Sequence, residues 1–276
     1  MSITAQDVNK LRKMTGAGMM DCKKALTEAN GDFEAAIDLL RKKGQKVSAS
    51  RADRQTSEGA VYVTTDTSGQ EGVLIALNCE TDFVAKNEEF QALGNAILKV
   101  AADQNPESIE ALLALPLDEL TVSEKIVELI GKIGEKIEIS AYERLQADKV
   151  ITYIHAGSKL GVLVGLDGSN GSDVDSAGKD VAMQIAAMNP VAVDKDQVDT
   201  SVVEREMAIG REQAIAEGKP ENIVDKIATG KLNKFFKENT LLNQAFVKDN
   251  SLTVSKYLDG VKQGLTVKDF RRVAIG

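Results

Sequence analysis

The chain has 276 residues, of which 43% are hydrophobic, so it is long enough for two or three domains with substantial cores. Its 34 basic and 42 acidic residues leave a formal net charge of −8, which argues against nucleic acid or an anionic membrane as the main partner. Aromatic residues make up only 4% and tryptophan is absent, so stacking on bases is poorly supplied.

The sequence shows no sign of export or membrane insertion. Its first residues, MSITAQDVNKL, carry an acid early and no apolar segment, so they do not resemble a signal peptide. No apolar run approaches the length of a membrane span. Cys22 and Cys79 lie far apart and form no metal or redox motif, so we expect buried reduced thiols. The sequence therefore predicts a cytoplasmic protein without a bound metal or cofactor.

Residues 1–54 are predicted to form a small basic module of three helices. They contain 11 Lys and Arg against 7 Asp and Glu, whereas the rest of the chain is acidic. The three helices are expected to begin after a cap at Ser2 or Thr4, at Met19, and after a cap at Asp32. Gly44 is expected to end the third helix, and the basic, apolar-poor residues 46–54 are predicted to be a linker.

The turn between the first two helices is the exposed candidate of this module. Gly16 and Gly18 bracket the turn, and glycine tolerates the positive φ that a sharp turn requires. Met19 and Met20 follow, and methionine side chains adapt to partner surfaces. The two methionines could equally close the small core, so the sequence leaves both interpretations open.

The remaining residues, 55–276, contain a weak internal repeat. In each copy two strands joined by a glycine-containing loop precede a helix. The predicted strands are 60–63 and 72–77 in the first copy, and 150–154 and 161–166 in the second. Further strand-like or helical pieces are 106–135, 137–145, 244–247, 253–260 and 268–274. The pattern predicts an α+β body of small antiparallel sheets backed by helices, with subdomains at 55–145 and 146–276.

The junction after the strand ending near Leu77 is the second candidate site. Thr81 is a plausible N-cap for a following helix, with Asp82 in its first turn. Asp82 and Phe83 could displace something from a partner's pocket, or Phe83 could belong to the core while Asp82 only supports the helix start. The second copy has Gly-Ser-Asn-Gly-Ser at residues 168–172 instead. This asymmetry favours a functional role, because a purely structural device would recur in both copies.

Residues 200–240 predict a helical hairpin that projects from the body. Helices at 201–217 and 221–237 are separated by Gly-Lys-Pro, which suits the end of one helix and the start of the next. A narrow seam of small and apolar residues is expected at Val203, Met207, Gly210 and Ala214. The outer faces are charged, so a solvated projection, a partner contact and self-association all remain open.

No catalytic constellation is present in the sequence. His155, the single histidine, lies near a predicted strand end without a motif that would supply a nucleophile or an orienting acid. Walker A, Rossmann and zinc-binding patterns are absent. We therefore expect a protein that is not an enzyme and holds no nucleotide of its own.

Five motifs are GAGMMDCKKAL at residues 16–26, TDFVA at 81–85, KIGE at 132–135, YIH at 153–155 and GVLV at 161–164. Together they resemble the elongation factor Ts family, the bacterial guanine-nucleotide exchange factors for elongation factor Tu. The resemblance extends over essentially the whole chain. Two departures are Ala245, where the family commonly has proline, and an end at Gly276 without the longer C-terminal module of some members. The resemblance therefore implies no contacts of such a module.

The resemblance implies a non-enzymatic mechanism that acts on elongation factor Tu with GDP bound or without nucleotide. Phe83 would wedge between partner side chains and Asp82 would disturb the residues around the magnesium ion, with Thr81 and Val84 completing the intruding segment. Nucleotide and factor would then weaken each other's binding reciprocally. Further partner contacts implied by the matching positions are Ile133, Gly134 and His155.

The alternative is a protein-binding adaptor without exchange activity. The first 45 residues resemble a ubiquitin-associated-type three-helix module, a fold that elsewhere binds peptide or protein surfaces. An adaptor would bind elongation factor Tu without changing the rate of GDP release, so that rate discriminates between the two hypotheses.

Overall fold

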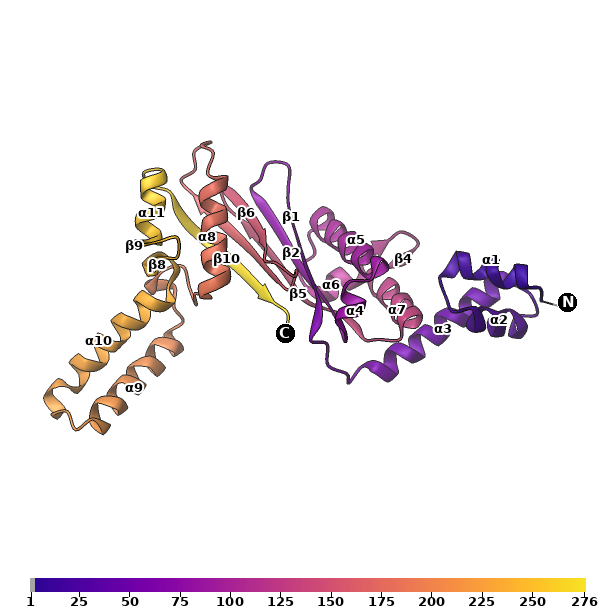
Figure 1. The fold of residues 1–276 in the computed structure, drawn as a ribbon, viewed down its shortest axis with the longest axis horizontal. Helices are drawn as coiled ribbons and strands as arrows, with labels where there is room; N and C mark the ends of the chain where they lie inside the picture. Colours follow the sequence, from indigo (N-terminus) through magenta and orange to yellow (C-terminus); the bar gives the residue numbers. More distant parts are fainter. Residues whose placement is uncertain (1–2) are drawn as a thin grey trace.

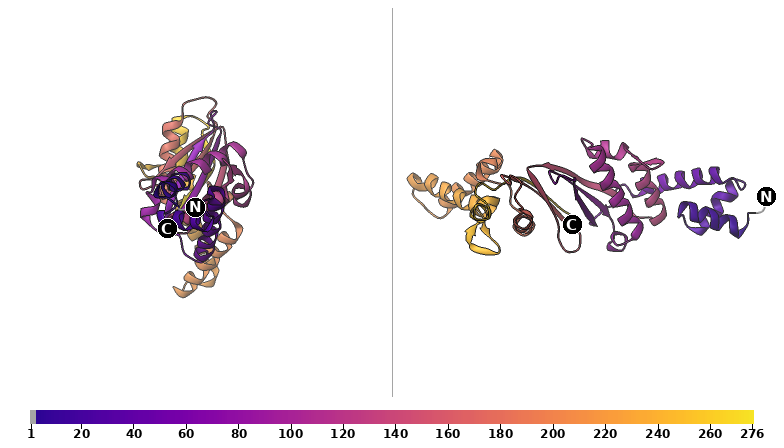
Figure 2. Two further views of the ribbon diagram at one scale, coloured as in Figure 1. Left: turned by 90° about the vertical axis from the view of Figure 1, so that its right-hand side faces the viewer. Right: turned by 90° about the horizontal axis from the view of Figure 1, so that it is seen from above.

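Three helices form one end of an elongated α+β molecule (Figures 1 and 2). The computed structural model describes residues 3–276. The helices are α1 (Ala5–Thr15), α2 (Met19–Glu28) and α3 (Phe33–Arg51). Thr4 caps α1 through a capping box with Asp7, and Asp32 caps α3, as predicted; Ser2 lies outside the described residues. The three helices enclose a small core of their own that includes Leu11, Leu26 and Ala36.

The prediction that α3 ends at Gly44, with a linker after it, is wrong. The helix continues to Arg51, and Gly44 lies buried in its interior. At this point α3 crosses α7 (Val122–Ile133), and a Cβ built on Gly131 would lie only 2.9 Å from the Cα of Gly44. Val47, one turn further on, packs against the core of the first sheet. Close helix contact thus overrides the local stop signal, because tertiary packing outweighs intrinsic propensity.

The predicted repeat is confirmed by two three-stranded antiparallel sheets. The first has the order β1-β2-β5 and the second the order β10-β7-β6. Their strands are β1 (Glu58–Thr65), β2 (Glu71–Cys79), β5 (Ile137–Gln146), β6 (Lys149–Ile154), β7 (Leu160–Asp167) and β10 (Thr266–Ala274). In both copies the second strand of a hairpin is central, and the strand that completes the sheet arrives after a helical insertion. The duplication therefore includes a third strand that the sequence pattern did not assign to it.

Helices cover the outer face of each sheet (Figure 1). The first sheet carries α4 (Asp82–Ala85), α5 (Glu88–Gln104), α6 (Ile109–Ala114), the short hairpin β3 (Pro116–Leu117) and β4 (Leu120–Thr121), and α7. The second carries α8 (Asp175–Met188), the short pair β8 (Ala245–Phe246) and β9 (Asp249–Thr253), and α11 (Val254–Val261), with 3₁₀ turns at Lys195–Gln197 and Leu241–Asn243. Each layer pair has its own apolar core. The boundaries 1–54, 55–145 and 146–276 as separately folding units stay a prediction.

The inner faces of the two sheets pack directly on each other through glycine. A Cβ on Gly72 would lie 2.6 Å from Cγ1 of Val150, and a Cβ on Gly161 would lie 2.4 Å from Cγ1 of Val61. The two glycines occupy the same place in the two copies, each the second residue of its central strand. The buried residues of this contact are Val61, Leu74, Ala76, Leu145, Val150, Leu163 and Ile275. The contact is therefore made twice, by matching residues of the two copies.

The remaining two helices form the projecting hairpin at the far end of the molecule (Figure 1). They are α9 (Thr200–Ala216) and α10 (Glu221–Asn239), close to the predicted bounds. Gly210 allows close approach, because a Cβ there would lie 3.0 Å from Cα of Ala228. The buried residues of the hairpin, Gly210, Ala214, Val224 and Ala228, are not among those of the sheet cores. Within residues 3–276, none of the helices has both the length and the apolarity needed to cross a membrane.

The sheet–sheet contact predicts a specific cost for enlarging Gly161. Gly161→Ala should lower the free energy of unfolding by about 1–3 kcal/mol, because the added methyl group overpacks the contact with Val61. Adding Val61→Ala should restore part of that loss. The control is Gly230→Ala in α10, where nothing lies within 4 Å of the added methyl group, and it should gain about 0.5–1 kcal/mol. Urea unfolding of the wild type and the three variants measures these free energies. Equal stability of Gly161→Ala and Gly230→Ala would contradict the packing argument.

The hairpin predicts a second outcome. Replacing residues 202–237 by a short Gly/Ser bridge should leave both sheets folded, because the hairpin buries its apolar residues within itself. Circular dichroism should show the loss of the hairpin helices only, and the shortened protein should still melt cooperatively. Global unfolding of the shortened protein would show that the second subdomain depends on the hairpin.

Candidate functional site

The helix α4 presents one large aromatic side chain to solvent. Phe83 is 82% exposed, whereas the next two residues, Val84 and Ala85, are 8% and 9% exposed and belong to the core of the first sheet. The interpretation that Phe83 is a core residue is therefore wrong. Val84 and Ala85 hold the four-residue helix on the body, and Phe83 lies on its outer side. We call Thr81–Val84 the tip.

Thr81 fixes the start of α4, as predicted. Its hydroxyl accepts a hydrogen bond from the amide of Val84 at 3.4 Å, the geometry of an N-cap. The same hydroxyl donates to Oε1 of Glu135 at 2.7 Å, and the amide of Thr81 donates to Oε2 of Glu135 at 3.0 Å. Beneath it, the buried thiol of Cys79 donates to the carbonyl oxygen of Thr81 at 3.2 Å. The backbone at this position is therefore held from several sides.

The carboxylate of Asp82 is exposed and paired with Lys86 one turn along, with 2.7 Å between Oδ2 and Nζ. The hydrogen bond from Lys86 lowers the pKa of Asp82, and the charges of Lys86 and of the more distant Lys159 act in the same direction. Asp82 is thus a negative charge at neutral pH, directly beside the exposed ring of Phe83. Because the ion pair is solvated, it is weak and its partner is exchangeable.

The turn after α1 has the two glycines at its ends, as predicted, and it decides between the two interpretations of the methionines. Gly16 has φ of 66° and is the C-cap of α1, and Gly18 is the N-cap of α2. Met19 and Met20 are 50% and 63% exposed, so they do not close the small core. A Cβ on Gly16 would lie 2.7 Å from Nζ of Lys132, near the C-terminal end of α7. The turn therefore lies against α7, the helix that directly precedes the Glu135 segment.

Ile133 and Gly134 form the end of α7. Gly134 has φ of 85° and is the C-cap, and Ile133 is half-buried against the core of the first sheet. The carbonyl oxygen of Gly134 accepts a hydrogen bond from Nε of Arg51 at 3.0 Å. These residues directly precede Glu135, so the structure brings them next to the tip.

His155 approaches from the second sheet. It is exposed in the turn after β6, and its Nδ1 lies 2.9 Å from the hydroxyl of Tyr153. The same turn contacts β1, because the carbonyl oxygen of Ser158 accepts from the amide of Val61 at 2.7 Å. Lys159 of this turn pairs with Glu58 at 2.7 Å. The turn therefore lies on the side of the first sheet where α4 begins.

Sequence reasoning missed Glu135, Lys86 and Lys159. The i,i+4 spacing of Asp82 and Lys86 was a usable signal for the ion pair. Glu135 belongs to the KIGE motif, but no local pattern links Glu135 or Lys159 to its partner, because each meets that partner only through strand pairing or sheet packing. Their partners lie 54 and 101 residues away in the sequence.

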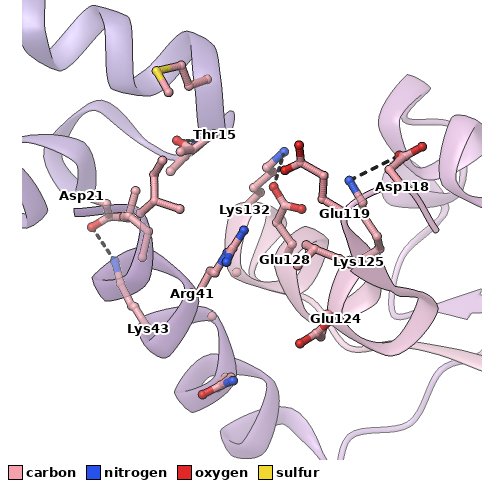
Figure 3. A pocket seen from close by; sticks show the side chains of 18 residues that line it. Thr15, Asp21, Arg41, Lys43, Asp118, Glu119, Glu124, Lys125, Glu128 and Lys132 are labelled. Atoms are coloured by element: carbon pink, nitrogen blue, oxygen red, sulfur yellow. Dashed lines mark hydrogen bonds and ion pairs between the residues drawn. The ribbon is translucent and has the colours of Figure 1, made fainter. Parts of the chain in front are cut away.

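A cavity of about 460 Å³ lies elsewhere, between α1 and α3 on one side and α7 with the β3–β4 hairpin on the other (Figure 3). Charges of both signs line it, including the ion pairs of Lys43 with Asp21 and of Lys125 with Asp118. It contains no tip residue. Most of its charged groups are paired, because Glu128 also pairs with Lys132.

Comparison with known proteins agrees with the motifs. The family model for Elongation factor TS matches residues 80–276. Elongation factor Ts of Amoebophilus asiaticus (strain 5a2) is 62% identical over 276 residues, which cover all of both chains. The proteins of the same name from Cytophaga hutchinsonii and Christiangramia forsetii are 59% and 52% identical, each over 99% of both chains. The chain therefore belongs to the elongation factor Ts family of translation factors.

Proposed function

We propose that this chain binds elongation factor Tu and accelerates the release of GDP by inserting the tip near the phosphate and magnesium site. The family assignment supports the partner. The exposure of Phe83 is the single observation that carries the mechanism, because a large aromatic residue left in solvent on an anchored segment is typical of a residue that a partner buries. The chain supplies binding energy and needs no catalytic group of its own.

The two tip side chains have different tasks in this proposal. Burying the ring of Phe83 on the partner supplies about 1.5–3 kcal/mol of apolar transfer energy, which can offset the separation of partner side chains. Asp82 brings a negative charge toward residues around the magnesium ion, after exchanging Lys86 for a partner group. Because factor and GDP then favour different conformations of the partner, each lowers the other's affinity by the same factor.

Other exposed groups extend the proposed contact beyond the tip. Met19 and Met20 provide an adaptable apolar surface on the N-terminal module, and Ile133, Gly134 and His155 line the approach to the tip. The hairpin also presents two apolar side chains to solvent, since Ile209 is 38% exposed and Ile215 is 65% exposed. We assign the hairpin either to the partner contact or to self-association, and light scattering with and without residues 202–237 distinguishes the two.

Phe83→Ala is the central test. Because the ring is exposed, the free energy of unfolding of the variant should lie within about 0.5 kcal/mol of the wild-type value. GDP release from elongation factor Tu at saturating factor should slow roughly 30-fold, the equivalent of the ~2 kcal/mol that defines an interface hot spot. The rate is measured with fluorescent GDP in a stopped-flow instrument.

Two controls frame that result. Phe90→Ala removes a fully buried ring and should cost about 3–5 kcal/mol of stability. Val191→Ala trims an exposed apolar side chain of the second subdomain and should change neither quantity. A Phe83→Ala protein that melts normally and releases GDP at the wild-type rate would exclude the wedge mechanism; binding without accelerated release by the wild type would support the adaptor.

Asp82→Ala should slow GDP release several-fold with little change in melting temperature, because its ion pair with Lys86 is exposed. The defect should shrink when a chelator removes magnesium, since displacement of the ion is then no longer required. Asp103→Ala is a matched control, because Asp103 forms a similar exposed pair with Lys99 at 2.5 Å. An Asp82→Ala defect of the same size with and without magnesium would show that the carboxylate does not act through the ion.

A further inference from the structure

The strand pair β2–β5 ends directly beneath the tip. Its last paired residues are Cys79 and Ile137. Continuing the antiparallel register by two residues places Glu80 opposite Lys136 and Thr81 opposite Glu135. No backbone ladder forms there, because β2 turns into α4 while β5 follows the C-cap of α7.

Beyond the end of the ladder, two carboxylates accept the hydrogen bonds of the backbone amides. Oε1 of Glu80 accepts from the amide of Lys136 at 2.7 Å, and Oε2 of Glu135 accepts from the amide of Thr81 at 3.0 Å. The bonds are reciprocal, since each segment offers one side-chain acceptor and one backbone donor to the other. We call the four residues the clasp. Such charge-assisted bonds are stronger than neutral ones.

Glu135 makes one bond more, and this bond reaches α4. Its Oε1 accepts the hydroxyl proton of Thr81 at 2.7 Å, which leaves a lone pair of the hydroxyl oxygen for the amide of Val84. The carboxylate polarises the hydroxyl and makes it a better acceptor, so the bonds in this chain strengthen one another. Glu135 therefore fixes both the entry of the tip and its helix cap.

The other half of the clasp is connected to the N-terminal module. Arg54 pairs with Glu80 at 2.9 Å, and Nζ of Lys136 donates to the carbonyl oxygen of Arg54 at 3.2 Å. Partial burial would raise the pKa of Glu80, but the bonds from Lys136 and Arg54 outweigh it and lower that pKa. Glu80 thus stays ionised and binds Arg54 in the segment after α3, whereas Glu135 binds Thr81 of the tip.

The geometry points to Glu135 as a positioning residue for nucleotide exchange, which holds Thr81 so that Asp82 and Phe83 meet the partner in one fixed orientation. The inference rests on the proposed exchange function. Glu135 does not touch the partner in this account; it acts through Thr81. Without it the tip still carries Phe83, but its amide and cap lose their acceptor and the segment becomes mobile.

The test separates orientation from binding. Glu135→Gln keeps the shape but offers one acceptor oxygen in place of two, so GDP release at saturating factor should fall about tenfold, because a charge-assisted bond to the tip is lost. The factor concentration for half-maximal release should change less than twofold, since the methionine turn and the other contacts are intact. Glu143→Ala is the control: this carboxylate of β5 pairs with Arg271 at 3.1 Å, away from the tip, and its loss should leave both quantities unchanged.

A double variant tests whether Glu135 acts through Thr81. Thr81→Val removes the hydroxyl, so adding Glu135→Gln should slow release less than it does in the wild-type background. Full additivity would overturn the proposed route. A Glu135→Gln protein with the wild-type maximal rate, or with weaker binding as its only defect, would overturn the positioning role.

Hydrogen exchange gives a readout that does not depend on the partner. In the free protein, Glu135→Gln should accelerate amide exchange in residues 79–86 and leave β6 and β7 unchanged. Unchanged exchange in residues 79–86 would overturn the clasp itself. If the wild type fails to accelerate GDP release, the proposed function fails while this measurement still decides whether Glu135 holds the tip.

Discussion

The direct contact between the two sheets determines how the two copies of the body lie relative to each other. Because Gly72 and Gly161 carry no side chains, the inner faces of the two sheets approach closely. The β6–β7 turn can therefore hydrogen-bond to β1. That approach carries His155 and Lys159 of the second copy to the side of the first copy where α4 begins. The meeting of these residues, which are far apart in the sequence, thus depends on having glycine and not alanine at positions 72 and 161.

The duplication shows which parts of the site are specific to one copy. After β7 the second copy turns through Gly168, with φ of 84°, and Lys262 donates to the carbonyl oxygens of Gly168 and Ser169. That loop is tied down by its backbone and presents no aromatic side chain. The first copy has a helix cap and a bidentate carboxylate in the same place. The two loops are both held firmly, but only one holds a side chain outward.

Local signals sufficed for much of the fold. The caps at Thr4, Asp32 and Thr81, the strand pairs of the repeat and the bounds of the hairpin follow from spacing and residue type. The exposure of Phe83 did not, because a four-residue helix has no periodicity from which to infer its buried face. Gly44 misled for a related reason: a glycine that stops a helix and one that lets another helix approach look identical until the second helix is placed. Glu135 was hidden by its 54-residue separation from Thr81.

The unbroken course of α3 has a mechanical consequence. A helix of 19 residues is about 28 Å long and resists bending, so the N-terminal module and Arg51 are the two ends of one rigid arm. The crossing at Gly44 and Gly131 lies between them and packs the arm closely against α7. Because Nε of Arg51 donates to the carbonyl oxygen of Gly134, this one helix connects the N-terminal module to the residue that directly precedes Glu135.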